Sequence, residues 1–233
     1  MSKSGTSPVP PRAFFGRRKG HKLRPHRAAL FVTLLPQLAV DTARPAPADL
    51  HSLFPIPVSR IALEIGFGGG ENLVREALAH GETGFIGCEP FINGMASALA
   101  AIEANRLKNI RLHHGDAIEL LDWLPAGSIA RVDLLYPDPW PKKRHHKRRF
   151  VSENSVARLA RVLAHGGLFR FATDIDHYAE WTLLHLLRSK DFEWTAERAE
   201  DWRKPWPGFG GTRYEAKAIR EGRTPCYLVF RRV

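Results

Sequence analysis

Short runs of apolar residues alternate along most of the chain with longer segments whose apolar positions recur at helical spacing. The expected strands are residues 60–65, 84–90, 110–113, 131–136, 168–172 and 226–230. The expected helices are residues 71–80, 93–106, 117–123, 151–164 and 178–189. Because strands that alternate with helices form a mostly parallel sheet covered on both faces, the pattern predicts an α/β protein with a doubly wound sheet. Such sheets bind ligands at the carboxyl ends of their strands.

Local signals place two helix boundaries, and one stretch departs from the alternation. Asn93 is expected to cap the helix that it opens, and Gly166 and Gly167 are expected to stop the helix at 151–164. Between residues 194 and 225, three tryptophans and a Pro/Gly-rich segment favour a loop before the final strand.

The first 27 residues are rich in Ser, Pro, Gly and Arg and lack a periodic apolar pattern. They indicate a basic, partly flexible arm, because such a composition buries too little apolar surface to offset the entropy of ordering. The predicted organisation is an arm over residues 1–50 and one domain over residues 51–233. The longest apolar stretch, residues 28–40, is shorter than the roughly 20 residues that cross a bilayer, so no membrane partner is expected.

Composition narrows the class of protein. A hydrophobic content of 44% and a charged content of 25% exclude an intrinsically disordered chain and a fibrous one. Two cysteines, Cys88 and Cys226, are too few and too far apart for a disulfide framework or a zinc site. Reduced thiols are typical of cytosolic proteins, and a cytoplasmic location is expected.

The formal net charge of +11 is concentrated in two segments. Residues 1–40 carry eight Lys or Arg and no Asp or Glu, and residues 142–149 carry six more, while the rest of the chain carries 21 basic and 24 acidic residues. Because each neutralised phosphate releases counterions, such segments favour binding to a polyanion. For residues 1–40 alone, a solubilising tail is the alternative.

A glycine-rich loop follows the first strand, with glycines at positions 66 and 68–70. It is not the dinucleotide fingerprint, because the third glycine of that motif would fall at position 71, which is Glu. By itself the loop is equally typical of a tight turn without a ligand.

Glu89 closes the second strand about 20 residues further on, where an acid can accept hydrogen bonds from a ribose diol, and Asp116 follows the third strand. Acids at consecutive strand ends favour a shared ligand rich in donors, although a helix cap or a surface acid is the alternative for each.

This spacing resembles the S-adenosylmethionine-dependent methyltransferases of the Rossmann-like class. The shared features are Glu-x-Gly-x-Gly-x-Gly from Glu64, an acid that closes the second strand, and Gly-Asp after the third. The resemblance implies a Rossmann-like methyltransferase fold with an antiparallel C-terminal strand. The residues implied to bind the cofactor are Gly66, Gly68 and Gly70 along its methionine end, Glu89 at the ribose, Asp116 near the adenine, and Glu64, which anchors the loop or meets the amino group.

The segment Tyr136-Pro-Asp-Pro-Trp-Pro-Lys-Lys-Arg-His-His-Lys-Arg-Arg149 places an acid and an aromatic residue directly before a run of cations. Prolines on both sides of Asp138 stiffen the backbone and disfavour helix. The combination suits an enzyme that acts on one nucleobase, because cations bind phosphates, Trp140 can stack on a base and Asp138 can accept N–H bonds from guanine. A solvated patch or a localisation signal is the alternative for the cations. His145 and His146 are adjacent and point apart, so a metal site is not expected.

The same segment is similar to the hallmark of the bacterial tRNA (guanine-N7-)-methyltransferases, the TrmB group. The resemblance covers about residues 55–231. It is also carried by Leu63-Glu-Ile-Gly-Phe-Gly-Gly-Gly, Gly87-Cys-Glu-Pro, Thr173-Asp174 and Thr212-Arg-Tyr-Glu215. Tyr136 and Tyr214 stand where the family often has phenylalanine, and Arg213 where it often has lysine.

The resemblance implies S-adenosylmethionine as methyl donor, tRNA as substrate and the variable-loop guanine at position 46 as the usual target. It implies that Asp138 is the active-site acid, also bordering the cofactor, and that Lys142 and Asp174 contact substrate. The residues implied to meet RNA are Arg144, His145, His146, Lys147, Arg148 and Arg149. The residues implied to close over the target guanine are Thr212, Arg213, Tyr214 and Glu215. No metal is expected, and the protein is expected to be a monomer or a homodimer.

Guanine N7 carries an in-plane lone pair and no proton, so its methylation needs alignment more than a strong base. The hypothesis for Asp138 is therefore that it orients the guanine and favours the developing positive charge. Two other classes of function stay open from the residues alone. One is a methyltransferase of the same fold that acts on protein or a small molecule, which would not need two cationic segments. The other is a non-catalytic RNA-binding module, which would not need acids at successive strand ends.

Overall fold

The computed structural model describes residue 16 and residues 18–233. The strands are β1 Arg60–Ile65, β2 Thr83–Cys88, β3 Ile110–His113, β4 Ile129–Leu135, β5 Leu163–Thr173, β6 Phe192–Trp194 and β7 Cys226–Arg232. The α-helices are α1 Pro25–Thr33, α2 Leu35–Leu38, α3 Glu71–Ala79, α4 Ile92–Asn105, α5 Ala117–Trp123, α6 Glu153–Val162, α7 Asp176–Leu187, α8 Glu200–Arg203 and α9 Arg213–Arg220. Two 3₁₀ turns are η1 Leu50–Leu53 and η2 Lys143–Arg148.

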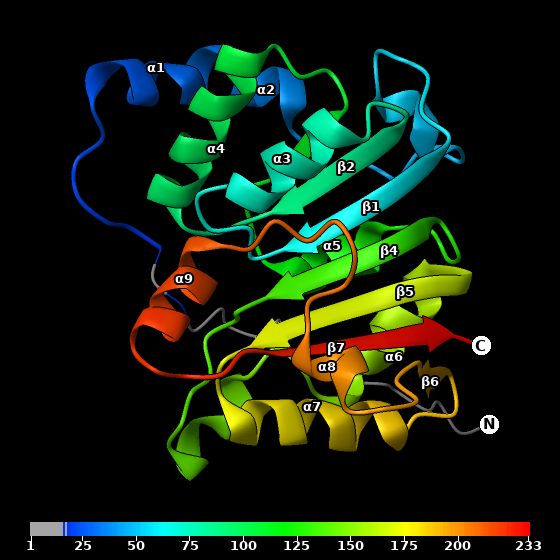
Figure 1. Ribbon diagram of the computed structural model, residues 1–233. Coiled ribbons are helices and arrows are strands. Elements are labelled where there is room, and N and C mark those ends of the chain that lie inside the picture. The colour runs from blue at the N-terminus through cyan, green and yellow to red at the C-terminus, as the bar shows by residue number, and fades with distance from the viewer. Residues whose placement is uncertain (1–15, 17) are drawn as a thin grey trace, which may run out of the picture.

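The strands form one sheet in the order β3-β2-β1-β4-β5-β7-β6 (Figure 1). The first five strands are parallel, whereas β7 runs antiparallel to β5 and β6 antiparallel to β7. The expected α/β class, with a mostly parallel doubly wound sheet and an antiparallel C-terminal strand, is confirmed. The order reverses between β1 and β4, so this is the topological switch point at which such sheets bind ligands.

Alternation along the strands divides the core into two layers. Ile61, Leu63 and Ile65 of β1 pack in one hydrophobic cluster with residues of α5, α6 and α7. Ala62, between them, packs in a second cluster with residues of α1, α2, α3 and α4. Because successive side chains of a strand point to opposite faces, the burial of residues 61–65 shows that β1 is covered on both faces.

The expectation that Asn93 caps α4 is wrong. The helix begins one residue earlier, its N-cap is Phe91, and no side chain caps it. The Asn93 side chain instead accepts a hydrogen bond from the Gly20 amide at 2.8 Å and donates one to the His21 carbonyl at 2.8 Å. Asn93 therefore ties the segment that precedes α1 to the start of α4.

The expectation that Gly166 and Gly167 stop α6 is also wrong. The helix ends at Val162, and Leu163 already pairs with Ile129 of β4. Both glycines thus lie inside β5. Hydrogen bonding to β4 begins at Leu163, three residues before Gly166, so pairing between strands and not the glycines ends the helix.

Helix α9 lies in the stretch that was expected to be a loop. Its N-terminus is a capping box in which the Thr212 hydroxyl accepts from the Glu215 amide, and the Glu215 carboxylate accepts from the Thr212 amide. The pattern Thr-x-x-Glu is a sequence signal for a helix start and could have identified this helix.

The described part of the predicted basic arm packs against the domain. The Ile92 amide donates to the Arg18 carbonyl at 3.0 Å, and α1 lies along α4 (Figure 1). Lys3, Arg12 and Arg17, which contribute to the predicted charge of the arm, lie outside the described residues. Among the residues that are described, no helix is long and apolar enough to cross a membrane.

Candidate active site

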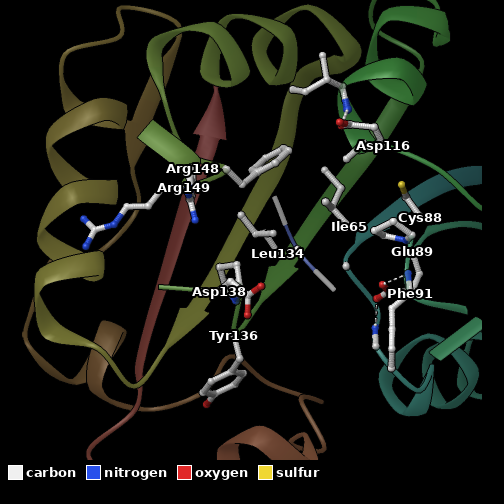
Figure 2. Close-up of a pocket in the computed structure, with 18 of the residues that line it drawn as sticks. Ile65, Cys88, Glu89, Phe91, Asp116, Leu134, Tyr136, Asp138, Arg148 and Arg149 are labelled. Atoms are coloured by element: carbon white, nitrogen blue, oxygen red, sulfur yellow. Dashed lines mark hydrogen bonds between the residues drawn. The ribbon is translucent and has the colours of Figure 1, made fainter. Parts of the chain in front are cut away.

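A cavity of about 410 Å³ opens at the carboxyl ends of β1 and β4 (Figure 2). Its wall contains Gly66 and Gly68 of the glycine-rich loop, and Ile65 and Leu134 from the strands. Of the other residues singled out in the sequence, Glu89, Asp116, Asp138, Trp140, Arg148, Arg149 and Tyr214 also line it. The sheet thus brings to its switch point side chains that are distant in the sequence, such as those of Ile65 and Tyr214.

Glycines 66 and 68 have the left-handed backbone that a side chain disfavours, with φ of +70° and +57°. A Cβ added at Gly66 would meet no atom within 4 Å, so it would project into open space at the cavity wall. Gly70 has a different role, because a Cβ there would lie 2.7 Å from the Cβ of Ala98 on α4. Its prediction as a cofactor residue is not matched by a place in the cavity wall, and it permits close packing between the loop and α4.

Glu89 joins the loop to the start of α4. Its carboxylate accepts hydrogen bonds from the Gly68 amide at 2.7 Å and the Phe91 amide at 2.8 Å. Burial raises the pKa of Glu89, and the two amide donors oppose that rise. In Figure 2, Glu89 lies across the cavity from Asp138. An acid placed here can accept hydrogen bonds from a ligand while it holds the loop.

Glu64 lies outside the cavity wall. It is buried on the α3 face of β1, where its carboxylate accepts from the Asn72 side chain at 2.9 Å. Burial raises the pKa of Glu64 to about 8, and the hydrogen bond from Asn72 opposes this rise only in part. Of the two predicted alternatives for Glu64, anchoring the glycine-rich loop and α3 fits this position, and contact with the cofactor does not.

The buried Glu64 carboxyl makes stability depend on pH. The folded state retains a proton that the unfolded chain releases near pH 4.5, so stability falls as pH rises from about 4.5 to about 8. Glu64→Gln removes this contribution, and we expect the free energy of unfolding to fall less over that range, by about 1–3 kcal/mol. Urea denaturation at several pH values measures the difference. Glu180→Gln, at an exposed carboxylate, is the control, and equal pH slopes for wild type and Glu64→Gln would contradict the assignment.

Asp116 has two roles in the geometry. It is the N-cap of α5, where its carboxylate accepts from the Ile118 amide at 2.8 Å, and it also lines the cavity. The helix-cap alternative for this acid is therefore correct. It does not exclude ligand binding, because a carboxylate has further acceptor sites.

Asp138 lies in a loop whose backbone is unusual on both sides. Tyr136 and Trp140 have positive φ values of 49° and 42°, and prolines occupy positions 137, 139 and 141. Within residue 16 and residues 18–233, no group donates a hydrogen bond to the Asp138 carboxylate and no cation pairs with it. The cavity walls raise the pKa of this carboxyl by burial, although solvent still reaches it. Asp138 is thus an acceptor available to a ligand.

The cationic segment divides into an exposed part and a buried end. Lys142, Lys143, Arg144 and Lys147 are exposed. The Arg148 guanidinium lies 4.9 Å from the centroid of the Trp140 ring, and the His145 ring packs edge-on to Trp140 at 5.9 Å. His146 packs instead on His177 and Trp181 of α7, at 6.2 and 5.4 Å between ring centroids.

Arg149, the end of this segment, is only 1% exposed. Its guanidinium donates to the Pro139 carbonyl at 2.9 Å and to Nδ1 of His177 at 2.7 Å. Its contact with RNA stays a prediction, and the burial leaves little of the side chain for it, since Nε, Nη1 and Nη2 each donate a hydrogen bond inside the protein. Nothing in the charge pattern separates it from Arg148.

The late motif contributes one residue to the cavity wall, Tyr214. Thr212 and Glu215 form the capping box, and Glu215 is buried beside the Tyr227 hydroxyl, which donates to it. Arg213 pairs with Glu71 at 3.4 Å and packs on Tyr214. Thus Thr212, Arg213 and Glu215 support the position of Tyr214 here rather than facing the cavity.

Lys142 and Asp174 also lie outside the cavity wall. Lys142 is exposed at the start of η2. Asp174 pairs with Arg223 at 2.5 Å, so its carboxylate already has a cation. Their predicted contacts with substrate require a ligand that extends beyond the cavity.

Sequence reasoning missed the apolar part of the wall, which includes Cys88, Phe91, Ile118 and Phe150, and also residue Gly16. Burial raises the pKa of the Cys88 thiol, so Cys88 acts as an apolar group. The signal available for Cys88 and Ile118 was their position in the sequence, within two residues of the predicted acids Glu89 and Asp116. Across the described residues, no group of three or more His, Cys, Asp or Glu is arranged to hold a metal ion.

Comparison with known proteins adds to this geometry. The model of a family described as "Putative methyltransferase" matches residues 59–228. A tRNA (guanine-N(7)-)-methyltransferase of Rhodopseudomonas palustris strain BisB18 is 63% identical over 96% of this chain and 89% of its own length. A protein of the same name from Nitrobacter winogradskyi is 57% identical over 100% of this chain and 90% of its own. The fold is similar to that of the 16S rRNA methyltransferase KamB, with a TM-score of 0.55 at 15% identity over 76% of this chain and 89% of that one.

Proposed function

Because this chain belongs to the family of bacterial tRNA (guanine-N(7)-)-methyltransferases, we propose that it transfers a methyl group from S-adenosylmethionine to N7 of the guanine at position 46, in the variable loop of tRNA. We also infer that residues 51–233 form the methyltransferase domain and that residues 1–50 form a basic arm that extends the contact with tRNA.

The cavity fits the methyl donor. Gly66 leaves open space where a side chain would stand, and the apolar side chains of Ile65 and Phe91 suit an adenosine. Glu89 supplies carboxylate oxygens for the ribose diol, and Asp116 lies after β3, where the adenine amine would be placed. When bound, S-adenosylmethionine supplies a methyl group on a positively charged sulfur.

The chain's own residues would align and stabilise the acceptor. Asp138 accepts N–H bonds from the guanine and, as a carboxylate, favours the positive charge that the base gains. Trp140 offers an aromatic ring next to Asp138, and Tyr214 limits the cavity from α9. No residue has to remove a proton from N7, because guanine carries none there.

One observation carries the proposal. The Asp138 carboxylate has no partner among the described residues, borders the same cavity as Glu89 and Gly68, and stands beside exposed cations at positions 142–144 and 147. A single site thus combines a place for adenosine, an acceptor for a nucleobase and cations for phosphates. A non-catalytic RNA-binding module has no use for the first of these.

The test is transfer of labelled methyl from S-adenosylmethionine to unmodified tRNA transcripts, followed by chain cleavage at 7-methylguanine to locate the product. Label at position 46 supports the proposal. Label at another guanine would correct the position, and cofactor binding without label on any tRNA would favour a protein or small-molecule acceptor. Failure to bind S-adenosylmethionine would favour the RNA-binding module.

The exposed cations are expected to bind phosphates. Lys142→Ala should weaken tRNA binding about 3- to 10-fold and reduce the slope of log K against log salt concentration by about 1, because one phosphate contact is lost. The affinity for S-adenosylmethionine should not change, since Lys142 lies outside the cavity wall. Filter binding at several salt concentrations measures this, with Lys190→Ala, an exposed lysine beyond the far end of α7, as the control. An unchanged salt slope, or an equal loss of cofactor affinity, would contradict the assignment.

A further inference from the structure

Arg149 stands at the end of the cationic segment, yet it is one of the largest side chains that the fold buries. Residues 142–148 leave their cations at the surface or over Trp140, whereas the Arg149 guanidinium lies between α7 and the loop that contains Asp138. Within the described part of the chain, no carboxylate pairs with it. Burying a cation without a carboxylate partner is unfavourable unless other groups accept its hydrogen bonds and pack on the guanidinium plane. The groups that take the place of a carboxylate around Arg149 therefore indicate its role.

Those contacts connect the loop to α7. The Arg149 Nε donates to the Pro139 carbonyl at 2.9 Å, and Nη2 donates to Nδ1 of His177 at 2.7 Å. The carbon of the guanidinium lies 4.9 Å from the centroid of the Tyr178 ring and 5.1 Å from that of Trp181. Nη1 also donates to the His177 carbonyl at 3.4 Å, so the charge is stabilised by two aromatic rings and three neutral acceptors.

The loop lacks most of the backbone donors that would otherwise fix it. Three of the residues from 137 to 141 are proline and lack an N–H donor. Trp140 has a φ of +42°, which a bulky side chain adopts only where the surroundings hold it. Pro139, whose carbonyl Arg149 binds, lies between Asp138 and Trp140, so this hydrogen bond acts at the centre of the loop.

We propose that Arg149 is a positioning residue that, from inside the protein, holds the Asp138 carboxylate and the Trp140 ring where the target guanine binds. The inference rests on the proposed function for its effect on catalysis. Both neighbours in this cationic run border the cavity, and the proposal separates their roles: the Arg148 guanidinium lies over Trp140, whereas Arg149 acts through its hydrogen bonds to the loop and α7. His177 takes part as the acceptor, with its Nδ1 unprotonated because a guanidinium can only donate.

The experiment compares Arg149→Lys and His177→Ala with wild type. Lysine keeps the charge but cannot donate in two fixed directions while stacking between rings. We expect Arg149→Lys to lower kcat for methyl transfer at least 10-fold and His177→Ala to lower it less. KM for tRNA, the salt slope and the affinity for S-adenosylmethionine should stay within about twofold of wild type. His185→Ala, which removes a ring packed at a tilt against Trp181, is the packing control and should retain kcat.

A second readout does not depend on activity. Amide hydrogen exchange in peptides that contain Trp140 and Lys142 should be faster in Arg149→Lys and His177→Ala than in wild type, and unchanged in His185→Ala. If Arg149→Lys does not fold, kcat and loop exchange measured in His177→Ala are sufficient to test the proposal.

A loss confined to KM for tRNA in Arg149→Lys, or an unchanged kcat with unchanged exchange in both variants, would overturn the proposal. If the wild-type protein methylates no tRNA but the two variants still exchange faster at the loop, the positioning role of Arg149 stands and the proposed function is refuted.

Discussion

Asp138→Asn is expected to reduce the rate of methyl transfer to tRNA about 100- to 1,000-fold, the largest effect of any single change in the site. Asparagine has the shape of aspartate but lacks its charge and half of its acceptor capacity. Because no group in the described residues binds the Asp138 carboxylate, the change removes no internal contact. The loss should therefore appear in catalysis and not in folding.

The pH dependence separates the orienting role of Asp138 from that of a general base. The carboxyl has a pKa raised by burial, so the wild-type rate should fall as acid protonates it, with a midpoint above the ordinary value of 3.8. Since burial of this charge opposes folding, Asp138→Asn should leave the melting temperature equal or slightly higher at pH 7. Single-turnover transfer with saturating cofactor measures the rate. A steep rise in rate with a midpoint above about pH 7 would indicate proton removal, and wild-type activity in Asp138→Asn would exclude both roles.

Gly94→Ala is expected to weaken S-adenosylmethionine binding more than 10-fold and to lower the melting temperature by several degrees. Gly94 lies in α4, where a Cβ would stand 2.2 Å from the Gly68 carbonyl oxygen and 3.4 Å from Cγ of Glu89. Both neighbours belong to the cofactor cavity, and the first is backbone that cannot turn aside. Overpacking of this kind costs about 1–3 kcal/mol and displaces what it contacts.

The expected loss of stability in Gly94→Ala is opposite to what helix propensity predicts. Alanine favours a helix interior over glycine by about 1 kcal/mol, so helix preference alone would make Gly94→Ala stabilising. Gly81→Ala is the control, because a Cβ there meets nothing within 4 Å. Calorimetric titration with the cofactor and a melting curve measure the two effects. A Gly94→Ala protein that melts higher than wild type and binds the cofactor equally would show that α4 and the loop can separate.

Much of the architecture follows from local sequence. The strands at 60–65 and 110–113 and the helix at 117–123 begin and end where apolar periodicity and glycine breaks predict. These boundaries depend on steric limits of the backbone and on alternation, which short segments contain in full. The sequence also predicted that acids at consecutive strand ends share a ligand, whereas the order of the strands comes from the structure.

Other features depended on packing between distant segments. The helix over residues 151–164 was expected to continue to its glycines, but pairing of Leu163 with Ile129 ends it first. Asn93 has the side chain of a helix cap, yet it binds Gly20 and His21 because that segment passes beside it. No window of local sequence contains both partners of such contacts.

The candidate site shows the same division. Residue types alone identified Glu89, Asp116 and Asp138 as acids at strand ends, because parallel strands place their carboxyl ends together. Arg148 and Arg149 are identical and adjacent, and the sequence could only treat them alike. Tertiary structure separated them: the Arg149 donors reach Pro139 and His177, which flank it only once β4, β5 and α7 have packed. The sequence by itself therefore determined where charge accumulates in this protein, and the packing decided which charges remain available to a ligand, because burial depends on neighbours that are distant along the chain.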